Sequence, residues 1–211
     1  MPSSKTILYF ILILFSNGAA TASEEKISLN KLNYCKVTPA AINDYEPREF
    51  QASNNLLRQS GEFSIYCGEK IIIKGRLLDQ KCIPISDAKI YIWQAGCDGK
   101  YPYLPLRTHI NKNLINILSK SSFKGSGIAT TNNLGEFLFI TIKPRRHSQN
   151  SPYVNIRVEH RNLGDLQTKL VLSSKHLINV EQSNQDSISL MENIDTYDFD
   201  VVMKGKSLSR Y

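Results

Sequence analysis

The chain has 211 residues, of which 41% are hydrophobic and 21% are charged. These values are close to ordinary globular usage, so they exclude wholesale disorder, and the length suits one medium-sized domain with its own core. The formal net charge is +7 at pH 7, from basic residues scattered along the chain. The densest basic group, Lys143, Arg145, Arg146 and His147, is too short for a nucleic-acid arm, so no nucleic-acid partner is expected.

The N-terminus has the pattern of a secretory signal peptide. Lys5 precedes an apolar run at 7–15, and Ala20 and Ala22 form an A-x-A cleavage pattern. The run is too short for a transmembrane helix, which needs about 20 residues. We therefore expect residues 1–22 to be a cleaved signal peptide and the protein to be exported, either periplasmic or secreted. No stable membrane insertion is expected after cleavage; an uncleaved N-terminal anchor is the alternative.

Residues 23–60 are polar and irregular, which predicts an N-terminal arm in front of a domain spanning 61–211. Within that domain, several short segments have the β-branched, aromatic or alternating composition of strands. They are 71–78, 88–93, 135–142, 154–159, 168–172 and 197–203. Short strands separated by Gly, Pro and Asn predict an all-β protein, an antiparallel sandwich or barrel.

The segment 88–93 alternates most clearly. Its two faces would carry Lys89, Tyr91 and Trp93 on one side and Ile90 and Ile92 on the other. Residues 79–84 before it predict a hairpin-type connection from the preceding strand. Residues 101–124 predict a long loop, and long loops on β scaffolds often carry function.

The four cysteines all lie after the expected signal peptide: Cys35, Cys67, Cys82 and Cys97. An even number of cysteines in an oxidising compartment predicts two disulfides, and three pairings remain open. Their spacing contains no C-x-x-C pair and does not indicate a zinc site.

Several blocks of the chain resemble intradiol ring-cleavage dioxygenases, the family of the protocatechuate 3,4- and catechol 1,2-dioxygenases. The blocks are GRLLD at 75–79, AKIYIWQA at 88–95, DGKY at 98–101, GEF at 135–137 and TIKP at 141–144. The segment 35–39 is similar to the one preceding the family's core, and 197–205 is similar to its closing strand. Order and spacing agree from about residue 35 to 205, so the resemblance implies the β-sandwich of this family with an N-terminal arm.

The family holds a ferric ion with two tyrosines and two histidines and cleaves catechol-type rings between their hydroxyl groups. The resemblance places the first tyrosine at Tyr101, or at Tyr103 if the loop is realigned. The second tyrosine position is His147, and the two histidine positions are Asn155 and Arg157. Three of the four positions therefore differ from the family's ligands. If iron is bound, Tyr101 and His147 are the expected metal ligands.

Asparagine and arginine are poor replacements for histidine at an iron site. An asparagine carbonyl is a weak neutral donor, whereas an arginine guanidinium stays protonated and has no acceptor. Arg157 has another interpretation, as a substrate-binding cation for the carboxylate of an aromatic acid, against that of an ion-paired or exposed strand residue. His109 and His160 could join Tyr101 and His147 in a different metal site, although their spacing gives no specific support. The simpler interpretations are a surface histidine at 147, a structural tyrosine at 101 and a core tryptophan at 93.

Two functions are consistent with the sequence. In the first, the protein is a dioxygenase-family enzyme or subunit that cleaves a small aromatic diol with Fe3+. In the second, it is an exported non-catalytic binding or interaction module, or a non-catalytic subunit, on the same scaffold and without a cofactor. Either could act as a homo- or hetero-oligomer. The chain has no G-x-S-x-G, Walker, dinucleotide or H-E-x-x-H motif, and no catalytic residue is assigned.

Overall fold

The computed structural model describes residues 34–42, 45–58, 61, 63–107, 109–145, 151–173 and 194–206. All of them belong to one structural unit, Leu32–Tyr211. The expected signal peptide, residues 1–22, lies outside the described residues. Within the described part, no helix is long and apolar enough to cross a membrane.

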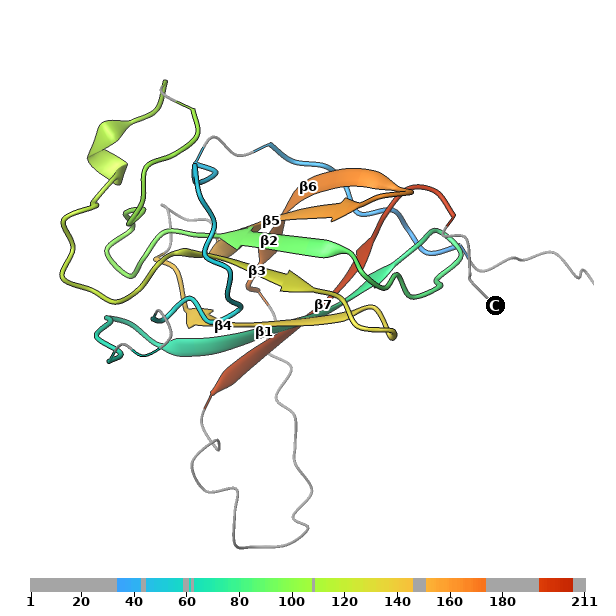
Figure 1. The fold of residues 1–211 in the computed structure, drawn as a ribbon, viewed down its shortest axis with the longest axis horizontal. Coiled ribbons are helices and arrows are strands. Elements are labelled where there is room, and N and C mark those ends of the chain that lie inside the picture. The colour runs from blue at the N-terminus through green and yellow to red at the C-terminus, as the bar shows by residue number, and fades with distance from the viewer. Residues whose placement is uncertain are drawn as a thin grey trace, which may run out of the picture. The chain divides into compact units, whose positions relative to one another are not determined.

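Seven strands in two sheets form the described part of the chain (Figure 1). In chain order, the elements are β1 (Lys70–Leu78), β2 (Lys89–Trp93), the 3-10 helix η1 (Lys112–Leu114), β3 (Ser126–Thr130), β4 (Glu136–Ile142), β5 (Tyr153–His160), β6 (Gly164–Val171) and β7 (Asp195–Val202). One sheet has the order β4-β1-β7 and the other β3-β2-β5-β6. Neighbouring strands are antiparallel except β1 and β7, which are parallel. The predicted all-β sandwich is confirmed.

The core lies between the two sheets, and alternation along each strand builds it. Ile71 and Ile73 of β1 are fully buried, as are Ile90 and Ile92 of β2. Ile92 pairs with Ile156 of β5, so apolar side chains of neighbouring strands meet on one face. The two faces predicted for 88–93 are therefore confirmed, and the opposite face of β2 is left for Tyr91 and Trp93.

The connection after β1 differs from the prediction. The Asp79 carboxylate accepts hydrogen bonds from the backbone N–H groups of Lys81 and Ile83, at 2.8 and 2.9 Å, and these bonds make a tight turn. Pro84 then pairs back on Leu78 in an isolated bridge. The two strands nevertheless lie in different sheets. A β1–β2 hairpin is therefore wrong, because this turn redirects the chain from one layer to the other.

The described part of the arm connects the two sheets along the side formed by β6 and β7. The Ala41 N–H donates to the Gln167 carbonyl of β6 at 2.8 Å, and the Thr38 N–H donates to the Val202 carbonyl of β7 at 3.0 Å. The Val202 N–H donates in return to the Thr38 hydroxyl at 2.9 Å. The arm therefore satisfies backbone groups of both edge strands at this side.

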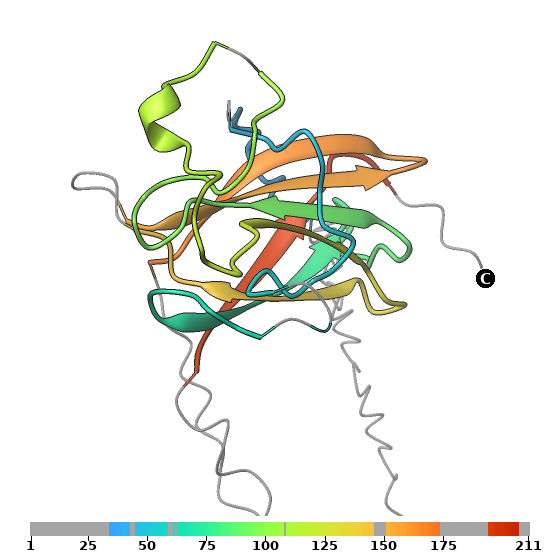
Figure 2. The same ribbon diagram turned by 60° about the vertical axis from the view of Figure 1, so that its left-hand side comes forward.

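Further along, the arm connects the sheets on the opposite side, between β3 and β4 (Figure 2). The Ile128 N–H donates to the Ser53 carbonyl at 3.0 Å, and the Ile140 N–H donates to the Asn54 carbonyl at 2.9 Å. Gly127 permits this approach, because a Cβ at this position would lie 2.4 Å from the Ser53 carbonyl oxygen. The segment between these two contacts crosses the outer face of the β3-β2-β5-β6 sheet, where it covers the candidate site.

The two predicted disulfides are confirmed, and the structure selects one of the three pairings. Cys35 bonds to Cys82 and ties the arm to the turn after β1, whereas Cys67 bonds to Cys97 and ties the segment before β1 to the loop after β2. The described residues include no free cysteine.

Mass spectrometry of the non-reduced protein should recover the same pairing. After proteolysis, we expect one linked peptide pair containing Cys35 and Cys82 and another containing Cys67 and Cys97, because each pair lies at disulfide distance in the fold. Peptides that link Cys35 to Cys67 or Cys97 would show that the arm follows a different path.

Candidate functional site

The candidate site lies on the outer face of the β3-β2-β5-β6 sheet, where β2 and β5 run side by side. Tyr91 pairs with Arg157, and Trp93 pairs with Asn155, so these four side chains are cross-strand neighbours on one face. Ile156 between the two β5 residues is fully buried in the core. Asn155 and Arg157, at the family's two histidine positions, therefore lie on the site face, as expected from the alternation along the strand.

An aromatic cluster covers this face. Tyr45 of the arm stacks on Tyr101 of the loop, with ring centroids 4.5 Å apart and planes 3° from parallel. Phe50 of the arm meets Trp93 edge to face at 5.9 Å, and Tyr103 tilts against Tyr101 at 5.7 Å. Tyr101 is only 3% exposed and Trp93 is fully buried. The arm and the loop thus fill the space above β2 with packed rings.

Arg157 is held by two carboxylates of its own chain. One guanidinium nitrogen, Nη1, donates to the Glu159 carboxylate. The Nε atom lies 3.0 Å from Oε1 of Glu46, an ion pair without the alignment of a hydrogen bond. The guanidinium carbon also lies 4.2 Å from the centre of the Tyr91 ring, a cation–π contact. The substrate-binding role expected for Arg157 stays a prediction, and a substrate carboxylate would have to compete with these partners.

Asn155 is fully buried beside the tryptophan strand. Its side-chain amide nitrogen donates to the Trp93 backbone carbonyl at 3.1 Å. The indole Nε1 of Trp93 is also buried, and it has no hydrogen-bond partner among the described residues. Asn155 therefore fastens β5 to the end of β2. Burying the indole N–H without a hydrogen-bond partner costs free energy.

The tyrosines around the site favour their neutral form. Burial raises the pKa of Tyr103 well above its usual value, and the nearby Tyr101 and Glu46 add to the effect. Burial also raises the pKa of Tyr153, although a hydrogen bond from the Tyr101 hydroxyl opposes this in part. For Tyr91, burial and a hydrogen bond to Glu159 both raise the pKa. Phenolate formation is thus disfavoured at three of the rings.

Tyr103 gives the site a pH dependence that can be measured. Its hydroxyl donates to the Tyr45 carbonyl at 3.1 Å, and its raised pKa means that it keeps its proton in the folded chain above pH 10.0, where the unfolded chain loses it. The free energy of unfolding should therefore fall as the pH rises above about 10. Urea unfolding across this pH range should show a smaller fall for Tyr103→Phe. An equal fall in both proteins would refute the assignment.

A family-type ferric site does not fit the described residues. The two histidine positions hold a neutral amide that is already bonded to Trp93 and a guanidinium that has no acceptor for a metal ion. Ferric iron prefers anionic oxygen and neutral imidazole donors, and neither an amide nor a guanidinium side chain replaces an imidazole. Within the described ranges, no group of three or more His, Cys, Asp or Glu side chains could hold a metal.

The other histidines considered as metal ligands are His109, His147 and His160. His147 lies outside the described residues, so its role as a ligand stays a prediction. His109 is exposed on the loop. The His160 Nδ1 accepts a long hydrogen bond from the Asn162 N–H at 3.3 Å, and burial lowers its pKa.

The sequence did not identify the arm residues Tyr45, Glu46 and Phe50, or Tyr153, as part of the site. Tyr153 had a signal, because it shares the face of Asn155 and Arg157 at spacing two. The arm residues had no such signal, since their contacts are with residues far away along the chain.

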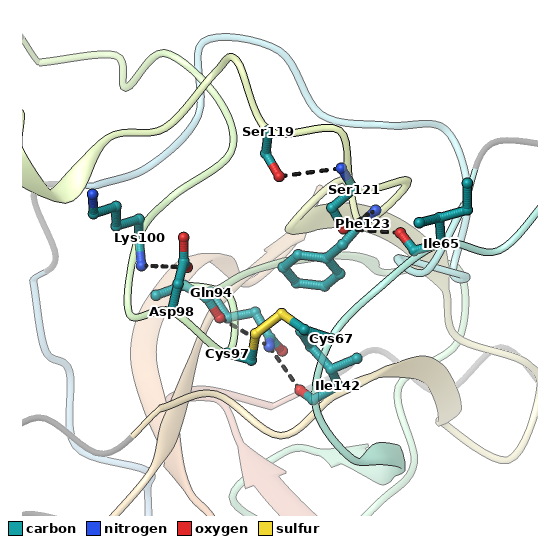
Figure 3. The surroundings of a disulfide bond; sticks show 11 residues. Ile65, Cys67, Gln94, Cys97, Asp98, Lys100, Ser119, Ser121, Phe123 and Ile142 are labelled. Carbon is teal, nitrogen blue, oxygen red and sulfur yellow. Dashed lines mark hydrogen bonds between the residues drawn. A yellow bond between two sulfur atoms is a disulfide. The ribbon is translucent and has the colours of Figure 1, made fainter.

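A disulfide braces the base of the loop that carries Tyr101 (Figure 3). Cys97 bonds to Cys67 close to Gln94, whose amide nitrogen donates to the Ile142 carbonyl at 2.8 Å. The Thr141 hydroxyl donates to the Gln94 amide oxygen at 2.9 Å, so the end of β2 is fastened to β4 as well. This bracing fixes the chain from which Tyr101 enters the aromatic cluster.

Comparisons with known proteins agree with this architecture. A family model described as Dioxygenase (Dioxygenase_C) matches residues 43–162. A Rickettsia felis protein, provisionally named a dioxygenase, is 46% identical over 209 residues, which are 98% of this chain and 100% of that protein.

Two solved structures are similar in fold at low identity. One is the intradiol ring-cleavage dioxygenase of Tetranychus urticae, with a TM-score of 0.55 and 16% identity over 81% of this chain and 95% of that one. The other is the 3-chlorocatechol 1,2-dioxygenase of Rhodococcus opacus 1CP, with a TM-score of 0.53 and 14% identity over 82% of this chain and 73% of that one. The chain belongs to the intradiol ring-cleavage dioxygenase family.

Proposed function

We propose that this chain is an exported, non-catalytic member of its family, which uses the dioxygenase scaffold as a binding or interaction module or as a non-catalytic subunit. The observation that carries the proposal is Arg157. At a position where the family has a histidine, the chain has a permanent cation, and Glu46 and Glu159 hold it in place. A guanidinium has no acceptor for a metal ion, and its donors are engaged by carboxylates of the same chain.

The arm completes this arrangement. Glu46 comes from the segment that crosses the sheet, and the same segment supplies the stacking partner of Tyr101 and the edge-to-face partner of Trp93. Because all three contacts come from residues 45–50, we expect them to form together. The place of a metal centre is therefore used to fasten the arm to the sandwich.

Export is supported by two independent features. The N-terminal sequence has the charge, apolar run and small-residue site of a signal peptide. Both cysteine pairs form disulfides, which persist in oxidising compartments and are rare in reducing ones.

One observation favours a second function, iron-dependent cleavage of a small aromatic diol at a rebuilt site. Four tyrosines gather at this place: Tyr45, Tyr101, Tyr103 and Tyr153. Phenolates are hard anionic donors of the kind that ferric iron prefers. The histidine positions weigh against it, because Asn155 and Arg157 do not replace the two imidazole ligands.

Oxygen uptake with catechol and protocatechuate separates the two functions. We expect no uptake above background from the oxidised mature chain, residues 23–211, after incubation with ferric iron, because the histidine positions cannot supply ligands. An established catechol dioxygenase serves as the positive control. Uptake by this chain that disappears in Tyr101→Phe would instead establish the enzyme function and a site rebuilt around that tyrosine.

A further inference from the structure

The loop between β2 and β3 and the segment before β1 carry four exposed apolar side chains. Its members, named here the apolar tip, are Phe63, Ile65, Ile117 and Leu118. Phe63 is 91% exposed and Leu118 is 89% exposed, while Ile65 and Ile117 are 64% and 52% exposed. Nearly complete exposure of a Phe and a Leu means that both side chains project from the surface. Such a group of apolar side chains marks an interaction site more often than a scattered one does.

Hydrogen bonds fix the two segments of the apolar tip beside each other. The Ser122 N–H donates to the Ile65 carbonyl at 2.6 Å, and the Ile65 N–H donates to the Ser122 hydroxyl at 2.8 Å. The Ser121 hydroxyl donates to the same Ile65 carbonyl at 3.0 Å (Figure 3). The Cys67–Cys97 disulfide lies two residues beyond Ile65. Hydrogen bonds and the nearby disulfide thus hold the two segments of the apolar tip in place.

The loop that carries Ile117 and Leu118 is basic, whereas the segment 61–69 contains Glu62 and Glu69 and no Lys or Arg. From residue 99 to residue 135 the sequence contains five Lys or Arg residues and no Asp or Glu: Lys100, Arg107, Lys112, Lys120 and Lys124. Lys112 and Lys120 are exposed on the same loop as Ile117 and Leu118. On the other segment, the Glu69 carboxylate is paired with Lys143 Nζ at 3.1 Å. The surface therefore combines projecting apolar side chains with a positive loop.

We propose that the apolar tip docks the exported chain on an anionic membrane surface, as a peripheral contact without a spanning segment. Peripheral membrane-binding surfaces have this composition. Their apolar side chains enter the boundary between headgroups and acyl chains, and flanking lysines attract anionic lipids. A lipid surface accepts projecting side chains without the matching pocket that a protein partner must supply. A second copy is disfavoured, because a two-fold contact would place this positive loop against itself.

Docking through the apolar tip is separate from the fastening of the arm on the sheet face. It stands whether or not the chain binds iron, because no residue of the apolar tip belongs to the aromatic cluster. Figure 1 shows the loop that carries η1 at one end of the sandwich and the turn between β3 and β4 at the other. Leu134 in that turn is 61% exposed and provides a matched control for Leu118.

Co-sedimentation with vesicles tests the proposal. Vesicles of equal parts phosphatidylglycerol and phosphatidylcholine should pellet the oxidised mature chain, whereas vesicles of phosphatidylcholine alone should pellet little. Leu118→Ser and Phe63→Ser should each lower the partition coefficient about tenfold, because each removes a side chain that leaves water on docking. Leu134→Ser should leave it unchanged. Salt should weaken binding, since it screens the lysines.

Three results would overturn the proposal. The first is the absence of pelleting with phosphatidylglycerol vesicles, and the second is equal pelleting with both vesicle types. The third is an equal loss in Leu134→Ser and Leu118→Ser. Light scattering of the free protein adds a separate check. If the protein self-associates and Leu118→Ser abolishes this, the apolar tip binds a second copy of the chain instead of a membrane. Circular dichroism spectra confirm that each variant is folded, so a loss of binding can be read as a loss of contact.

Discussion

Replacing Trp93 with alanine is expected to lower the free energy of unfolding by about 3–5 kcal/mol. Trp93 is fully buried and packs with Ala95 and Tyr101, and Phe50 of the arm meets its ring edge to face at 5.9 Å. Removing the indole would leave a cavity under the arm that the disulfide-braced loop cannot easily collapse into. Equilibrium unfolding in urea, under oxidising conditions, measures the change.

Trp93→Phe is the matched control for this prediction. It keeps an aromatic ring but removes the indole N–H, which is buried and has no partner among the described residues. Because no hydrogen bond is lost, we expect a cost of only about 1–2 kcal/mol from the smaller ring. A loss as large as that of the alanine variant would show that the indole N–H has a strong partner, and it would contradict the packing account.

Replacing Arg157 with methionine is expected to cost about 2–3 kcal/mol. The change keeps most of the aliphatic length but leaves two carboxylates facing one another across the site, those of Glu46 and Glu159. The Arg157 and Glu46 side chains are 23% and 19% exposed, so solvent reduces the cost below that of a fully buried pair. Urea unfolding again supplies the measurement.

A double-mutant cycle shows whether the carboxylate of Glu46 is the partner that matters. Glu46→Gln should lower the free energy of unfolding of the wild-type chain. It should lower it much less in the Arg157→Met background, because the guanidinium that pairs with the Glu46 carboxylate has been removed. Arg76→Ala is an external control. Its guanidinium makes a two-point contact with Asp200, but both side chains are more than half exposed, so little change is expected. Additive effects of the Glu46 and Arg157 changes would contradict the proposed coupling.

Most of the fold could be predicted from the sequence, because most strands have a recognisable composition or an alternation of apolar and polar residues. β3 was not predicted, since Ser126–Thr130 is made mostly of small residues, including Gly127, and has no apolar stripe. That composition suits an edge strand that must admit the backbone of the arm closely beside it. The β1–β2 connection was wrong for a related reason. A tight turn at Asp79 looks the same in sequence whether it joins neighbouring strands or changes layers.

The candidate site was predicted in part. Strand phase placed Asn155 and Arg157 on one face of β5, and Tyr101 lies above the neighbouring strand in the aromatic cluster. The partners of Arg157 could not be predicted completely. Glu159 is two residues away on the same strand, whereas Glu46 lies on an irregular arm whose path is set by contacts with the edges of both sheets.

The sheet face that holds iron in the family is occupied here by an internal ion pair and packed rings. Iron content and a visible absorption spectrum of the oxidised mature chain, taken after exposure to ferric iron and removal of the excess, test this directly. We expect substoichiometric iron and no tyrosinate-to-iron band, with Tyr101→Phe indistinguishable from the unchanged chain. One iron per chain with a visible band that Tyr101→Phe abolishes would contradict it.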